Sequence, residues 1–99
     1  MFKIEKKNIN QFSLPEITHK STSVERLILT ENNLNMLKYF LDESDYRWET
    51  GHRISELSPY KPGTVLYLYS DGVVYYSTLE LCMKTKQDYT AIEYFVDVW

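Results

Sequence analysis

Residues 65–79 read VLYLYSDGVVYYSTL and carry the strongest structural signal in the chain. Two runs of β-branched and aromatic residues, which are typical of strands, flank the pair Asp71-Gly72. A two-residue type I′ turn needs positive φ at both central positions, which Asp tolerates and Gly adopts freely. The stretch therefore predicts a β-hairpin with Asp71 and Gly72 at its tip, in which Ser70 pairs with Val73.

This register determines which side chains share a face, because successive residues of a strand point to opposite sides. One face would carry Leu66, Leu68, Val73 and Tyr75. The other face would carry Tyr67, Tyr69, Val74 and Tyr76. Such an aromatic sheet face is either covered by another segment, for which residues 1–12 and 44–63 are the candidates, or exposed as a binding surface.

The sequence before the hairpin predicts one main helix. Thr30 is a good N-cap, and the residues that follow it up to about Glu43 contain neither Gly nor Pro. Leu34, Leu37 and Leu41 form an i, i+3, i+7 stripe that would face the sheet. Residues 24–29 fit either a strand or the lead into this helix, and residues 44–63 show no sustained period.

The sequence after the hairpin tip predicts two more stretches of strand. Apolar side chains recur at most odd positions from Val73 to Met83, which favours a long second hairpin strand. A polar loop over residues 84–88 and a last strand over residues 90–99 follow, and Phe2 and Ile4 mark a short N-terminal strand. We therefore expect a single α+β domain over residues 1–99, with an antiparallel β-meander of three to five strands packed on one main α-helix.

Composition narrows the function classes. The 99 residues have a formal net charge of -3, so a basic face for direct binding to nucleic acid is not expected. No apolar run approaches the length of a membrane span. Cys82 is the only cysteine, which excludes an intramolecular disulfide and favours a reducing, cytoplasmic location.

Motifs for catalysis are missing. The chain has no HExxH, CxxC or GxSxG motif and no Gly-rich phosphate loop, and His19, His52 and Cys82 are far apart in sequence. We expect no enzymatic activity, no cofactor and no metal. The alternative is a small metal-dependent hydrolase in which Asp45, Glu49 and His52 supply the ligands of a divalent metal.

Short pieces of residues 61–99 follow one another as they do in a known family. These are a glycine-led strand, an aspartate-glycine hairpin, two aromatics and a Phe-x-Asp run, at Gly63, Asp71-Gly72, Tyr75-Tyr76 and Phe95-Val96-Asp97. In this order they resemble a Tudor-type SH3-like barrel, although the glycine after the last motif and the closing strand are missing. The resemblance implies a recognition module in which Tyr67, Tyr69 and Tyr76 form an aromatic cage for methylated lysine or arginine.

The function we expect first is a non-enzymatic protein-binding domain, an inhibitor or adaptor. In size, in richness in Asn, Lys and Tyr, and in lack of catalytic motifs, the chain resembles accessory proteins of bacterial viruses and mobile elements that block host enzymes or defence systems. The expected contact residues are the aromatics Tyr67, Tyr69, Tyr76, Phe95 and Trp99 and the acidic residues Asp42, Glu43, Asp45 and Glu49. The acidic group would steer a basic partner surface, such as that of a nucleic-acid-handling enzyme. The sequence is compatible with a monomer and with a homodimer.

Overall fold

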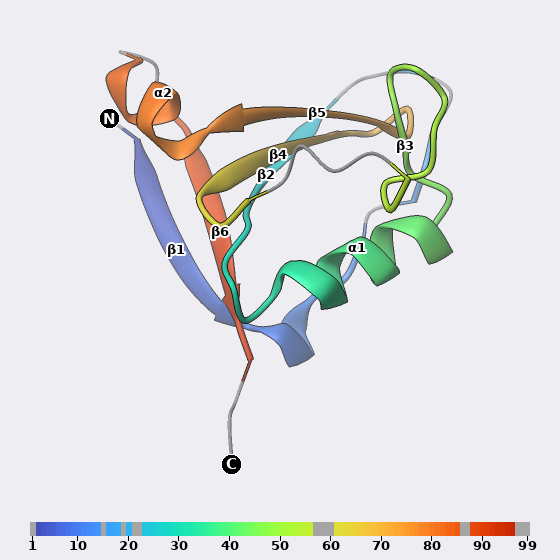
Figure 1. Cartoon of the computed structure of the whole chain (residues 1–99). Helices are drawn as coiled ribbons and strands as arrows, with labels where there is room; N and C mark the ends of the chain where they lie inside the picture. Colours follow the sequence, from blue (N-terminus) through green and yellow to red (C-terminus); the bar gives the residue numbers. More distant parts are fainter. Residues whose placement is uncertain are drawn as a thin grey trace.

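In the computed structural model, which describes residues 2–14, 16–18, 20, 23–56, 61–85 and 88–96, a six-stranded sheet lies between two helices of unequal length (Figure 1). The longer helix, α1, packs along one face of the sheet, and the short helix α2 covers one end of the opposite face. The described elements in chain order are β1 (Lys3–Asn8), the 3-10 helix η1 (Ile9–Gln11), β2 (Val24–Ile28), α1 (Leu34–Glu43), β3 (Arg47–Trp48), β4 (Thr64–Tyr69), β5 (Val73–Thr78), α2 (Leu79–Lys84) and β6 (Thr90–Phe95).

The sheet is mixed, so the expected antiparallel meander on one helix is wrong. Its strand order is β1-β6-β2-β4-β5-β3. β6 pairs in parallel with β1 and β2, and β3 pairs in parallel with β5, whereas β2–β4 and β4–β5 are antiparallel. The last strand does not follow β5 in the sheet, because the chain leaves β5 as α2 and returns between β1 and β2.

This departure begins at Thr78, where the alternating pattern predicts a strand that continues to residue 83. Instead, the Thr78 hydroxyl oxygen accepts a hydrogen bond of 3.1 Å from the backbone N–H of Leu81 and caps α2. Glu80 lies in the first turn and Lys84 in the last, as the helix dipole favours, and their side chains pair at 3.1 Å.

The burial of α2 shows why apolar residues at odd positions did not produce a strand here. Leu79 and Cys82, which lie one helical turn apart, pack against the sheet. Leu81 and Met83, which a strand would have pointed inward, are 57% and 61% exposed. The apolar residues of this stretch therefore fit a helical period as well as a strand period, and packing decides between the two.

The predicted hairpin forms, but its loop has three residues rather than two. The backbone N–H of Gly72 donates 3.0 Å to the carbonyl of Tyr69, and Gly72 has φ +89. The Asp71 carboxylate accepts 3.1 Å from the N–H of Val73. This is a turn followed by a left-handed glycine, a common three-residue hairpin connection. Relative to the predicted pairing, this loop shifts the register of β5 against β4 by one residue, and Val74 is completely buried.

The shifted register exchanges the two faces of β5. Leu68 pairs with Val74, and Leu66 pairs with Tyr76. We call the side covered by α1 the helix face; it includes Leu27, Leu66, Leu68, Val74, Tyr76 and Tyr94. We call the opposite side the outer face; it includes Val24, Arg26, Ile28, Val65, Tyr67, Tyr69, Val73 and Tyr75.

The predicted helix is present as α1, but it begins at Leu34 rather than directly after Thr30, and residues 31–33 form a turn whose ends are joined by two reciprocal hydrogen bonds. The N–H of Asn33 donates 3.2 Å to the Thr30 hydroxyl, and the N–H of Thr30 donates 2.8 Å to the Asn33 side-chain oxygen. Leu37 and Leu41 are completely buried in the core on the helix face. The sequence-derived stripe thus faces the sheet as expected.

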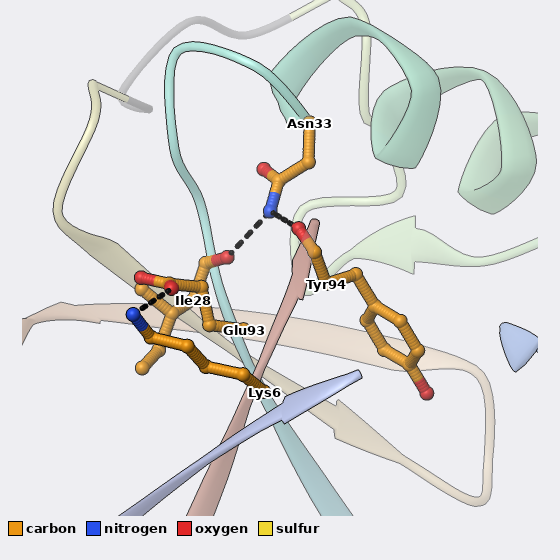
Figure 2. Close-up of polar contacts among 5 residues, drawn as sticks. All are labelled: Lys6, Ile28, Asn33, Glu93 and Tyr94. Atoms are coloured by element: carbon orange, nitrogen blue, oxygen red, sulfur yellow. Dashed lines mark hydrogen bonds and ion pairs between the residues drawn. The ribbon is translucent and has the colours of Figure 1, made fainter. Parts of the chain in front are cut away.

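Asn33 also joins α1 to two strands. Its side-chain nitrogen donates 3.2 Å to the carbonyl of Ile28 and 2.7 Å to the carbonyl of Tyr94 (Figure 2). Asn33 is completely buried, so these bonds satisfy polar groups that water cannot reach. The start of the helix is thereby held against the ends of β2 and β6.

The described parts of the two segments proposed to cover the tyrosines mainly form strands at the sheet edges, although Phe2 packs in the same cluster as Tyr67 and Trp48 contacts Tyr76. The N-terminal segment forms β1, which pairs with β6 at one edge of the sheet. The segment around Trp48 forms β3 at the other edge, and Trp48 is buried on the helix face. Residues 24–28 form the inner strand β2. Neither described helix has the length and apolar character needed to cross a membrane.

Candidate partner-binding surface

An arginine and three tyrosines lie side by side on the outer face. Arg26 of β2 is the register partner of Tyr67 of β4, which is in turn the partner of Tyr75 of β5. Tyr69 lies on the same face, and its ring meets that of Tyr75 edge to face at 5.3 Å. Adjacent strands thus bring together residues that are far apart in sequence.

The guanidinium of Arg26 is held between aromatic rings. Its central carbon lies 4.1 Å from the ring centre of Tyr89 and 5.6 Å from that of Tyr67. The Nε atom is buried and has no hydrogen-bond acceptor within the described part of the chain. The ring faces offset part of the cost of removing this cation from water, but they accept no conventional hydrogen bond.

Tyr67 contacts α2, which lies over one end of the outer face. Its hydroxyl lies 2.9 Å from the buried sulfur of Cys82. The hydroxyl of Tyr89 donates 3.2 Å to the carbonyl of Cys82. Burial, aided by the hydrogen bonds with Cys82 and Tyr89, raises the pKa of Tyr67 well above its usual value. The contact with Cys82 holds the Tyr67 hydroxyl in place.

The rest of the group is accessible. Tyr75 is 41% exposed, and Tyr69 and Arg26 are partly exposed. On the same face, Ile4 of β1 and Phe95 of β6 are each 43% exposed. Exposed aromatic and aliphatic groups around a positive charge are features of binding surfaces.

Tyr76 does not belong to this group, contrary to the sequence-derived register. It lies on the helix-face side of β5, where its ring meets that of Trp48 edge to face at 5.8 Å. Tyr67, Tyr69 and Tyr76 therefore cannot form one aromatic cage, and Tyr75 takes the expected place of Tyr76. The sheet is also open between β1 and β3 in the described residues, unlike the barrel that the Tudor-type resemblance implies.

Phe95, another aromatic candidate, is not brought to the tyrosines. Phe95 lies on the outer face at the end of β6, level with Asn8 of β1. Tyr67 lies level with Arg26 of β2, one residue before Leu27, where the pairing of β2 with β6 begins. Trp99 lies outside the described residues.

The acidic candidates lie on the other side of the sheet or at its edge. Asp42 and Glu43 are in the last turn of α1, while Asp45 and Glu49 flank β3. The Asp42 carboxylate accepts 3.3 Å from the N–H of Ser55, and Asp45 pairs with Arg47 at 3.6 Å. Asp42 and Glu43 therefore lie on the other side of the sheet from the outer-face tyrosines, while Asp45 is paired with Arg47 at the edge of the sheet, level with Val73.

No metal centre is found within the part of the chain that the structure describes. No three His, Cys, Asp or Glu side chains there are placed to hold an ion. His52 instead has its Nδ1 atom 2.8 Å from the hydroxyl of Thr50. His19 lies outside the described residues.

Sequence reasoning missed Arg26, Tyr89 and the contact between Tyr67 and Cys82. Arg26 joins the tyrosines only if residues 24–28 are a strand beside β4, and the sequence is also compatible with a helix lead-in there. The β-branched residues Val24 and Ile28 were the available local signal for a strand, because neither parity of residues 24–28 is uniformly apolar.

Comparison with protein-family models, curated proteins and solved structures found no match to this chain. The outer face itself therefore supplies the grounds for assigning a function: a fixed cation, a fixed phenol and an exposed pair of tyrosine rings.

Proposed function

We propose that this chain is a non-enzymatic protein-binding domain, an inhibitor or adaptor, that contacts its partner through the outer face. The pair formed by Tyr69 and Tyr75 carries the proposal, since these rings pack on each other and Tyr75 stays 41% exposed. Tyrosine and arginine are enriched where proteins meet, because they offer large contact area and a polar end. A sheet also holds such side chains in a fixed arrangement before the partner arrives.

The chemistry of the face suits contact better than catalysis. An ordinary phenol is protonated at neutral pH and burial raises the pKa of Tyr67 further, so this hydroxyl does not serve as a base there. The thiol of Cys82 is buried with 1% of its residue surface exposed, so a substrate would not reach it. The unpaired state of Cys82 also supports a cytoplasmic location.

The proposed contact surface is smaller than the one expected from sequence. It contains Tyr69, Tyr75, Arg26 and the exposed edge of Tyr67. The acidic group at the end of α1 and around β3 is left out, because it lies on the other side of the sheet or at its edge. Tyr76 is left out for the same reason.

The test compares two surface variants of the whole chain. Tyr69→Ser combined with Tyr75→Ser removes the exposed ring pair, while Tyr39→Ser removes a tyrosine on α1 that is 60% exposed. Tyr67 is unsuitable as a probe, because its hydroxyl is bound to Cys82 in the interior. Circular dichroism and urea unfolding confirm that both variants fold.

Tagged proteins are then incubated with a native lysate of the source cells, and captured proteins are quantified by mass spectrometry. We expect a specific protein to be captured by the wild type and by Tyr39→Ser, and lost with the double variant. Equal capture by both variants would overturn the proposal, as would lack of any specifically captured protein.

A further inference from the structure

Arg26 is a cation without an anion. Its Nε atom is buried and unsatisfied, and within the described residues no carboxylate or carbonyl is placed to accept from its guanidinium. By contrast, Arg47 donates 2.9 Å to the carbonyl of Tyr46 and pairs with Asp45. A partly desolvated guanidinium normally has an acceptor, because unmet donors cost free energy.

The nearby acidic residues are directed elsewhere. Glu25 is next in the chain but points to the helix face, where it adds to the effect of burial in raising the pKa of Tyr46 and Tyr94. Glu93 is on the outer face, but its carboxylate pairs with Lys6 at 3.7 Å (Figure 2). The outer face thus keeps one uncompensated positive charge on a protein whose formal net charge is -3.

The surroundings of Arg26 indicate what kind of anion it receives. The partly exposed ring of Tyr69 and the exposed ring of Tyr75 lie on one side of the face, and the exposed side chain of Ile4 lies on the other. These groups suit the apolar side chains of a polypeptide. A nucleic-acid backbone would instead need several unpaired cations, and the other cations on the outer face of the described strands, Lys6 and Arg47, are already paired with Glu93 and Asp45.

We propose that the outer face binds an acidic peptide segment of the partner protein, in which one Asp or Glu carboxylate is received by the guanidinium of Arg26 and the neighbouring apolar residues contact the tyrosine rings. This inference rests on the proposed function and names its partner chemistry. Arginine suits the role because its planar fork donates two parallel hydrogen bonds to a carboxylate. The rings hold the fork in place beforehand, which lowers the entropic cost of binding.

The experiment selects random dodecapeptides from a display library on the wild-type chain and measures their affinity for variants. We expect selected peptides to contain an Asp or Glu next to apolar residues and to lose binding to the Tyr69→Ser/Tyr75→Ser variant. We expect Arg26→Gln to lower the affinity of these peptides about tenfold to a hundredfold, since the lost hydrogen bonds join two charged groups. Lys38→Gln, which changes a cation on α1 on the opposite side of the sheet, is the control and should change affinity less than about threefold.

A second measurement uses the wild-type protein and does not depend on the folding of any variant. The Nε–H signal of Arg26 in an NMR spectrum should shift when the best acidic peptide binds. It should not shift with the same peptide carrying Asn or Gln in place of the acid. A phosphoserine version tests whether phosphate replaces carboxylate; tighter binding of that version would overturn the choice of a carboxylate.

The outcomes separate this inference from the proposed function. Selected peptides that need Tyr69 and Tyr75 but are basic or neutral, or that ignore Arg26→Gln, overturn the inference and leave a protein-binding outer face. If selection on the wild type returns no peptide that needs Tyr69 and Tyr75, the inference fails. The lysate experiment then decides the proposed function separately.

Discussion

The side-chain amide of Asn33 donates a 2.7 Å hydrogen bond to the carbonyl of Tyr94, which lies 61 positions later in the chain. The strands that Asn33 connects, β2 and β6, pair directly only at Leu27–Ile92 and Ile28–Glu93. The amide therefore continues their connection beyond the last strand pair, as Figure 2 shows. A single polar side chain thus adds to the short parallel pairing of β2 with β6.

Asn33→Ala should lower the free energy of unfolding by about 2–4 kcal/mol, because it leaves the buried carbonyls of Ile28 and Tyr94 without this donor. Asn32→Ala, at the exposed neighbouring position, is the control and should change stability by less than about 0.5 kcal/mol. Urea unfolding followed by circular dichroism measures both. Equal losses for the two variants would contradict the bridging role of Asn33.

Gly72→Ala should destabilise the chain more than Gly51→Ala. Both glycines have left-handed φ values, +89 and +87, so alanine costs about 1–2 kcal/mol at either position. At Gly72 the new Cβ would also lie 3.3 Å from the Cδ1 atom of Ile17, whereas nothing lies within 4 Å at Gly51. Midpoints of urea unfolding give the order, and the reverse order would show that the hairpin loop adapts freely.

Asp45→Gly should stabilise the protein by about 0.5–1 kcal/mol. Asp45 follows the end of α1 with φ 63, and the N–H of Tyr46 donates back to the carbonyl of Leu41, a helix end at which glycine is favoured. The lost ion pair with Arg47 matters little, because the Asp45 side chain is 85% exposed. Ser44→Gly, at φ -98, should lose stability instead. Thermal unfolding that shows a lower midpoint for Asp45→Gly would refute this account.

Alkaline pH should destabilise the fold through three tyrosines. Burial raises the pKa of Tyr46, Tyr67 and Tyr94 above the ordinary value of 10.0. Above about pH 10 the unfolded chain releases these protons while the folded chain retains them, so the free energy of unfolding should fall as pH rises. Each group contributes at most about 1.4 kcal/mol per pH unit.

Urea unfolding at a series of pH values from neutral to alkaline measures this slope. Below the ordinary tyrosine pKa the three groups should contribute no pH dependence, because both states are protonated. Tyr67→Phe should make the alkaline slope shallower, since one of the three linked protons is gone. An unchanged slope in that variant would show that Tyr67 is not linked to folding.

The sequence by itself was sufficient for two local structures. A hairpin around Asp71-Gly72 and a helix that ends near Glu43 both follow from turn chemistry and apolar spacing within short windows, although the helix was expected to begin after Thr30 and begins at Leu34. These signals are local, because the interactions that create them join residues only a few positions apart.

Only the tertiary structure decided the loop length, the identity of α2 and the parallel pairings of β6. Burial of Val74 on the helix face selects the three-residue loop, and packing of Cys82 against the sheet selects helix over strand after Thr78. Arg26 meets Tyr67 and Tyr89 only because β2 lies between β6 and β4. A one-residue change of register reverses a strand's faces at little local cost, so the whole core had to determine which tyrosines face outward.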